Sequence, residues 1–226
     1  MRSPARFDLH VHSRHSSDAS PSVAEIAARV EALGLRGFAL TDHNSAAGHS
    51  ELPELRARHP GLVVVPGVEV STRDGHLLAY GIGEAPVRDR PVDETIAWVR
   101  SHGGVPVLAH PFRFWHGVGR RVASSAAVTA IEGANGHSSV GVNRRAVAVA
   151  AARQLGTTGG SDAHVTGDIG RTWTEIEGPA DSVEEVLDAI RRGAVRGAGR
   201  SPTGGETARL AFRSAVRRLR RGFRPV

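Results

Sequence analysis

The chain has 226 residues, 40% of them hydrophobic, which is enough for one α/β domain with a sizeable core. It contains no cysteine, so disulfides and thiolate metal sites are excluded, and any metal must be held by imidazole and carboxylate groups. The formal net charge of +6 arises after Glu206, where seven arginines meet no acid, whereas residues 1–206 carry 22 arginines against 23 acids.

Apolar runs of strand length alternate with runs of helical spacing along the chain, a pattern typical of βα units. The expected strands are residues 7–12, 37–41, 62–70, 76–82, 105–111, 130–135, 157–164 and 169–176. The expected helices are residues 23–33, 46–58, 92–101, 142–155 and 182–192. No linker divides these elements, so we expect one compact body over residues 1–200, followed by an arginine-rich tail over residues 201–226.

The first expected strand contains the sequence Asp8-Leu9-His10-Val11-His12-Ser13. Because successive side chains on a strand alternate between its faces, His10 and His12 should point one way, and Leu9 and Val11 the other way, into a core. Two imidazoles on one edge form half of a metal site. Two histidines that only hydrogen-bond locally would give the same pattern, so this stretch alone leaves both interpretations open.

Side chains of metal-ligand type recur where the other expected strands begin or end. They are Asp42, His43, Glu69, His76, His110, Asp162 and His164, with Asp18 in the first loop. In a barrel the carboxyl ends of all parallel strands converge on one face, whereas in an open doubly wound sheet they spread along a crevice. Recurrence along the whole length therefore favours a barrel with one metal site.

These motifs, in this order, resemble those of the polymerase and histidinol phosphatase superfamily, the PHP domain. The matching stretches are residues 8–13, 41–43, 67–69, 109–111 and 161–164 (DLHVHS, TDH, GVE, AHP and SDAH). The resemblance spans about residues 7–177 and implies a distorted (β/α)7 barrel with its metal site at the carboxyl ends of the strands.

The resemblance also implies a ligand set for two or three divalent ions. The first metal would be held by His10, His12, Glu69 and Asp162; Glu69 would bridge to a second, held also by His76 and His110; and a third would be held by His43, His164 and Asp18, with His15 as the rival of Asp18. Imidazole and carboxylate ligands suit manganese, iron or zinc and do not choose among them.

The ligand types suit a metal-dependent phosphoesterase, in which a metal-activated hydroxide attacks phosphorus. Asp162 is a candidate both as ligand and as proton acceptor from the water, and His43 or His164 could protonate the leaving oxygen. The substrate would be a nucleotide, an oligonucleotide or a small phosphorylated metabolite. The alternative is a non-catalytic domain of the same fold that binds nucleic acid or a partner through the tail; the complete ligand set argues against it.

Other residues are candidates for contact with the substrate. An arginine is expected to orient the phosphate, and Arg171 is the first choice, followed by Arg144 and Arg113. Each of the three could instead be a solvated surface residue. Asn135 and His137 follow a strand on the same face and could contact the substrate, or could hold a turn by local hydrogen bonds.

The arginine-rich tail reads as a basic amphipathic helix between residues 207 and 223. It could pack on the barrel with its arginines in water, or it could contact nucleic acid or an anionic membrane surface. No apolar run reaches the ~20 residues of a transmembrane helix, and the N-terminus lacks the pattern of a signal peptide. A cytoplasmic protein is therefore expected.

Overall fold

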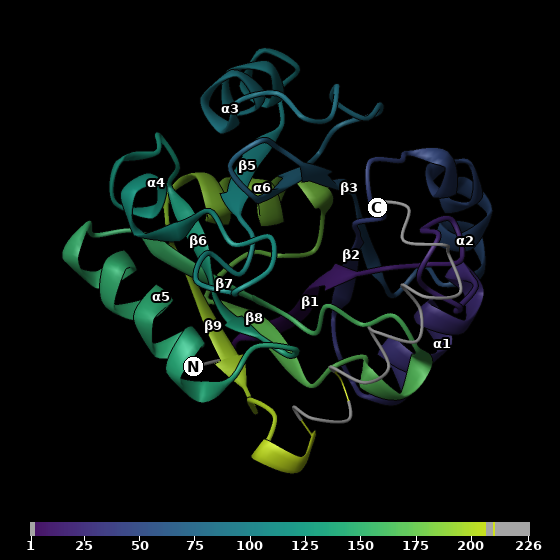
Figure 1. Ribbon diagram of the computed structural model, residues 1–226. Coiled ribbons are helices and arrows are strands. Elements are labelled where there is room, and N and C mark those ends of the chain that lie inside the picture. The colour runs from purple at the N-terminus through teal and green to yellow at the C-terminus, as the bar shows by residue number, and fades with distance from the viewer. Residues whose placement is uncertain (1–2, 207–209, 211–226) are drawn as a thin grey trace.

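The computed structural model describes residues 3–206 and Leu210, so the predicted tail helix lies almost wholly outside the described residues. A single sheet of nine strands in the order β7-β6-β5-β4-β3-β2-β1-β8-β9 curls into a nearly closed barrel, with helices around its outside (Figure 1). The strands are β1 (Ala5–Val11), β2 (Gly37–Leu40), β3 (Val63–Ser71), β4 (His76–Tyr80), β5 (Val105–Leu108), β6 (Ala130–Asn135), β7 (Gly156–Gly160), β8 (Thr172–Ile176) and β9 (Val195–Gly199).

The helices that cover the sheet are α1 (Val23–Ala32), α2 (Leu52–Arg58), α3 (Val92–Ser101), α4 (Gly119–Ser125), α5 (Val140–Ala152) and α6 (Val183–Arg191). Serine caps with a glutamate three residues later begin α1 and α6. Within residues 3–206 and at Leu210, no helix is both long and hydrophobic enough to span a bilayer.

The barrel is distorted because two of its strands run against the others. Strands β1, β2 and β3 are parallel, as are β5, β6 and β7, but β4 is antiparallel to both its neighbours and β8 is antiparallel to β1. The seam closes where the segment after β7 reaches β1: the Asp162 amide donates to the His10 carbonyl at 2.7 Å, and the His12 amide donates to the Ala163 carbonyl at 3.0 Å. The predicted distorted barrel is confirmed, and closure brings the first and last metal motifs together.

One α-helix and one strand were not predicted, and one predicted helix is divided. Residues 46–58 form a 3₁₀ helix (Ala47–Glu51) followed by α2, with Pro53 in the first turn of α2, where a missing N–H is tolerated. The elements that were not predicted are helix α4 and strand β9, whose sequences are weak signals for a helix and a strand; β9, for example, has the sequence VRGAG. Its Gly197 approaches β7 so closely that a Cβ there would lie 2.5 Å from the Thr158 carbonyl oxygen.

The expected face of β1 is also corrected. The register between β1 and β2 shifts between Asp8 and Val11, as at a β-bulge. Leu9 consequently packs in the core covered by α6, whereas Val11 packs in a different core, beneath α1. The two side chains do not share a face, and His10 and His12 are both completely buried.

Candidate metal centre

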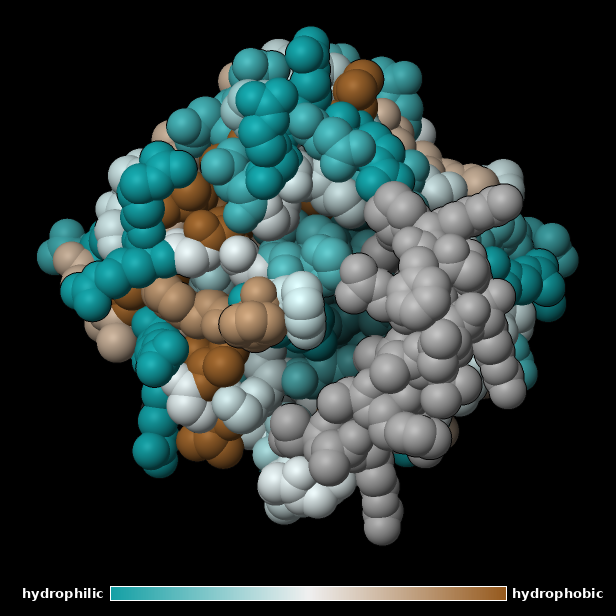
Figure 2. Space-filling view, viewed as in Figure 1, coloured by the Kyte–Doolittle hydropathy of each residue, from teal (hydrophilic) through white to brown (hydrophobic). Residues whose placement is uncertain are grey.

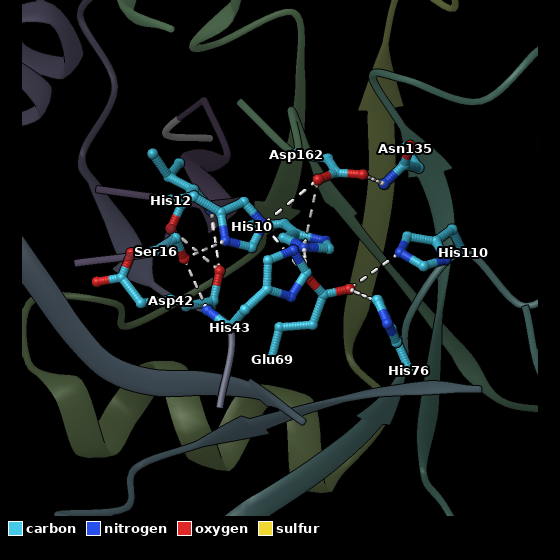
Figure 3. Close-up of polar contacts among 12 residues, drawn as sticks. His10, His12, Ser16, Asp42, His43, Glu69, His76, His110, Asn135 and Asp162 are labelled. Atoms are coloured by element: carbon cyan, nitrogen blue, oxygen red, sulfur yellow. Dashed lines mark hydrogen bonds and ion pairs between the residues drawn. The ribbon is translucent and has the colours of Figure 1, made fainter. Parts of the chain in front are cut away.

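The centre is organised around the carboxylate of Glu69, which is completely buried on β3 (Figure 3). Its two oxygens together face five imidazoles. Oε2 lies 3.2 Å from His10 Nε2, 3.3 Å from His12 Nε2 and 3.1 Å from His43 Nδ1, and Oε1 lies 2.7 Å from His76 Nδ1 and 3.0 Å from His110 Nε2. One carboxylate therefore connects imidazoles from four separate segments of the chain.

A second buried carboxylate, Asp162, faces the same imidazoles from the seam after β7. Its Oδ1 lies 3.3 Å from His12 Nε2 and 3.7 Å from His10 Nε2, and its Oδ2 accepts a hydrogen bond from Arg113 at 2.8 Å. Asp162 has a φ of 55°, in the left-handed region. Aspartate tolerates this conformation better than most residues, and here it turns the carboxylate toward His12.

Asp18 lies against the third group of predicted ligands. Its Oδ2 is 3.2 Å from His164 Nε2 and 3.8 Å from His43 Nε2. The rival residue, His15, instead has its Nε2 2.6 Å from Glu51 Oε1. The structure thus brings together all nine predicted ligands and places His15 elsewhere; their role as ligands stays a prediction.

The arrangement of donor atoms fits metal ions. Four sets of ligand-type side chains have donor atoms within 4.8 Å of one another: His12, His43 and His164; His10, His12, Glu69 and Asp162; His43, Glu69 and His76; and His137, Asp162 and His164. Within the described chain, several of these buried atoms have no hydrogen-bond partner, namely His10 Nε2, His12 Nε2, His43 Nδ1 and Glu69 Oε2. Buried polar atoms without partners are costly, and bound cations would satisfy them.

The buried charges shift one another's protonation. Burial opposes ionisation of Glu69, but the surrounding histidines outweigh it and hold its pKa well below the usual range. Burial likewise disfavours a charged His12, yet the carboxylates of Asp162 and Glu69, each 3.3 Å from its Nε2, raise its pKa to about 9. The pKa of His10 is also raised well above its usual value, against burial, by the charges of Glu69, Glu132 and Asp162.

These pKa shifts predict that metal binding displaces protons. A histidine must be neutral to coordinate a metal, whereas the raised pKa values of His10 and His12 favour the protonated forms in the metal-free protein. We expect Zn²⁺ or Mn²⁺ to release up to about two protons per chain at pH 7.5, and metal affinity to rise with pH up to about 9. Titration in weakly buffered indicator solution measures the release; a pH-independent affinity without proton release would contradict the assignment.

Glu132, on β6, is a residue of the site that sequence reasoning missed. Its Oε1 lies 2.9 Å from His10 Nδ1, and its Oε2 accepts from the His110 amide at 2.7 Å and from Asn135 Nδ2 at 3.1 Å. A carboxylate on the far nitrogen of a ligand histidine fixes its orientation and increases its basicity. The available signal was a glutamate inside an apolar strand, where an unpaired carboxylate is rare.

The three candidate arginines lie in different environments. Arg113 is in contact with the cluster through Asp162. Arg171, the first choice from sequence, pairs with Asp168 at 3.3 Å and with Glu206 at 3.3 Å. Arg144 is exposed on α5. Arg113 is therefore the one of the three that the structure brings to the metal centre.

Asn135 and His137 lie beside the cluster, on the turn after β6. Asn135 is buried; it donates to Asp162 Oδ2 at 3.2 Å and accepts from the His137 amide at 2.9 Å. It therefore both holds the turn and orients Asp162. The His137 ring stacks on that of His164, and its Nε2 lies 3.6 Å from Asp168 Oδ2.

Comparison with known proteins identifies the family of the chain. The sequence pattern of the PHP domain matches residues 8–108, and the PHP-associated pattern matches residues 141–195. A 5′-3′ exoribonuclease of Haemophilus influenzae is 40% identical over 67 residues, which are 30% of this chain and 24% of that protein. The chain thus spans only a quarter of that relative's length.

Two solved structures share the fold at low sequence identity. A two-domain protein of Bacteroides vulgatus, described as containing a predicted PHP-like metal-dependent phosphoesterase, superposes with a TM-score of 0.70 and 18% identity, over 92% of this chain and 69% of that one. Endonuclease Q, bound to duplex DNA with an abasic lesion, gives a TM-score of 0.68 and 18% identity, over 88% of this chain and 60% of that one.

Proposed function

The chain belongs to the PHP superfamily, and from this membership we propose that it is a metal-dependent phosphoesterase acting on nucleotides, oligonucleotides or a small phosphorylated metabolite. The observation that carries the proposal is the Glu69-centred cluster of buried carboxylates and imidazoles. A domain that only bound a partner would have no need to bury so many ionisable groups around one carboxylate, because burying charge without compensation is costly.

The nine predicted ligands would hold two or three divalent ions such as manganese, iron or zinc. When bound, such ions lower the pKa of water and stabilise the negative charge on a phosphate undergoing displacement. Glu69 would contribute to more than one ion, since each of its oxygens faces a different set of histidines. Glu132 would keep His10 in the ligating orientation through its Nδ1.

Acid and base roles follow from the protonation of these groups. Burial disfavours ionised Asp162, but the charge of Arg113 outweighs it and holds the pKa well below the usual range, so Asp162 is ionised and can accept a proton or a metal. The two proposed donors to the leaving oxygen, His164 and His43, both lie beside Asp18. Burial holds the pKa of His43 well below its usual range, which favours His164 in this role.

Arg113 is the proposed orienting residue for the phosphate. Replacing it with methionine should raise KM for a phosphomonoester about tenfold or more, because a hydrogen bond to a charged group is lost. Steady-state kinetics measure the effect, with Arg144→Met on the exposed face of α5 as the matched control. If both variants keep the wild-type KM, Arg113 does not contact the phosphate.

A substrate panel with added Mn²⁺ tests the function itself. The panel compares an aryl phosphate, nucleoside bisphosphates, short single-stranded oligonucleotides and sugar phosphates, each with and without chelator. Chelator-sensitive hydrolysis of at least one class is expected; absence of bound metal together with no hydrolysis of any class would favour the non-catalytic alternative. The exoribonuclease relative and the DNA-bound endonuclease Q support including nucleic acids.

A further inference from the structure

The loop between β5 and α4 exposes two neighbouring aromatic side chains. Phe114 is 87% exposed and Trp115 is 62% exposed, and their rings meet edge to face with centroids 4.9 Å apart. Aromatic residues make up only 4% of the sequence. Among the described residues, the large hydrophobic side chains that are exposed are these two aromatic residues and three valines.

Both residues that flank the pair contact the metal centre. On one side, Arg113 donates to Asp162 Oδ2. On the other side, the His116 ring stacks on the ring of His76, with centroids 4.4 Å apart. Since consecutive Cα atoms are only 3.8 Å apart, the backbone of Phe114 and Trp115 runs within a few residues' reach of the predicted ligands. Figure 2 shows a hollow with hydrophilic residues inside it and hydrophobic side chains along the rim toward α4 and α5.

The base of the loop is held in place by its backbone. The His76 amide donates to the His116 carbonyl at 2.8 Å, and the Gly119 amide donates to the Pro111 carbonyl at 2.9 Å. Gly117 fits closely under the loop, because a Cβ there would lie 2.5 Å from the Arg113 carbonyl oxygen. A loop that is already ordered loses little conformational entropy when a ligand binds its tip.

The chemistry of this rim selects one kind of ligand. A phosphate ester whose phosphorus lies at the cluster would extend its alcohol portion toward the rim, where each ring of the exposed pair offers a flat apolar face. A sugar ring presents only part of its C–H groups to such a face, whereas an unpaired nucleobase stacks its whole π face on an aromatic ring whatever its sequence. In a duplex the bases already stack on one another, so the rim suits single strands and nucleotides.

We propose that Phe114 and Trp115 form a stacking platform for an unpaired nucleobase, so that the substrate is a nucleotide or the end of a single-stranded nucleic acid. This inference rests on the proposed phosphoesterase function and narrows its substrate class. Arg113 would hold the phosphate beside Asp162 while the adjacent platform holds the base. The platform would determine specificity and would take no part in the bond-breaking step.

The platform is tested by binding, so that the result does not depend on turnover. The probes are a single-stranded hexanucleotide with phosphorothioate linkages, which resist hydrolysis, and an abasic hexamer with the same linkages. The intact metal-loaded protein should bind the base-bearing probe about tenfold more tightly than the abasic one, and in the Phe114→Ala/Trp115→Ala variant the two affinities should converge. Trp98→Leu is the matched control: it removes an α3 ring that stacks on His102, and it should keep the preference for the base-bearing probe.

A second readout uses the platform's own fluorescence. The base-bearing probe should quench part of the tryptophan emission, and this quenching should disappear in Trp115→Leu, which keeps an apolar side chain at an exposed position. Equal affinity of the wild type for both probes, or a preference retained in the double variant, would overturn the platform. A Phe114→Ala/Trp115→Ala variant that differs from the wild type only in self-association, measured by sedimentation, would also overturn the platform. Failure of the phosphoesterase proposal would be seen separately, as no hydrolysis of any ester in the panel.

Discussion

Replacing Glu69 with glutamine is expected to lower kcat/KM for phosphate-ester hydrolysis by more than about 100-fold and to reduce the metal content of the purified protein. Loss of an outer partner of a metal ligand already costs about 10- to 100-fold, and Glu69 faces the ligands directly. Glutamine keeps the size of the side chain but loses its charge and presents an amide N–H₂ to imidazole nitrogens. Those nitrogens lie 2.7–3.3 Å from the carboxylate in the native cluster.

The matched control for this substitution is Glu51→Gln. Glu51 also contacts a histidine, His15, at 2.6 Å, but it lies apart from the predicted ligands. Elemental analysis and steady-state kinetics should separate the two variants, and circular dichroism checks that both are folded. A folded Glu69→Gln protein with wild-type metal content and activity would show that Glu69 is not a ligand, and the proposed centre would be lost with it.

The ligand cluster was largely predictable because it depends on strand order and on the period of two along each strand. A histidine or carboxylate at the end of a parallel strand must lie on one face of a barrel, whatever the loops do. The same argument failed for β1 in detail, because a one-residue shift in register moves side chains between faces. The local sequence of Asp8–Val11 does not indicate that shift in register.

Contacts that depend on loop conformation were not predictable in the same way. Arg113 and Arg171 both follow metal motifs, and only the path of the loop after β5 decides that Arg113 reaches Asp162. That path begins at His110 with a φ of 24° and includes His116 with a φ of 68°, conformations that non-glycine residues seldom adopt. The exposure of Phe114 and Trp115 also depends on this path, since an aromatic residue in sequence gives no sign of whether it is buried or exposed.

Glu132 was missed for a different reason: it contacts a predicted ligand, His10, rather than being one of the predicted ligands. Sequence motifs identify the atoms that meet a metal, but they do not show which carboxylate meets the other nitrogen of the same imidazole. That pairing depends on the separation of β1 and β6 across the barrel interior, where His10 Nδ1 and Glu132 Oε1 are 2.9 Å apart. Strand order alone does not fix so short a distance.

Replacing Asp162 with asparagine is the second substitution from which we expect a loss of activity of more than about 100-fold. Asparagine also tolerates the left-handed backbone found here, φ 55°, so the change should remove charge without disturbing the seam between β7 and β1. The neutral amide would no longer offset the charge of Arg113, nor accept the proton that the ionised carboxylate can accept.

The metal content should distinguish this variant from Glu69→Gln. The set formed by Glu69, His76 and His43 does not include Asp162, so at least one ion should remain bound to the Asp162→Asn variant. Glu69 belongs both to that set and to the set that contains Asp162, so its loss should affect both. Asp89→Asn is a close control: Asp89 also has a positive φ, 60°, and pairs with an arginine, Arg88, at 2.9 Å, but it is exposed and lies outside the ligand set. Because the two aspartates share backbone conformation and an arginine partner, equal activity of the two variants would mean that Asp162 is a structural residue, and the proton acceptor would have to be sought elsewhere in the cluster.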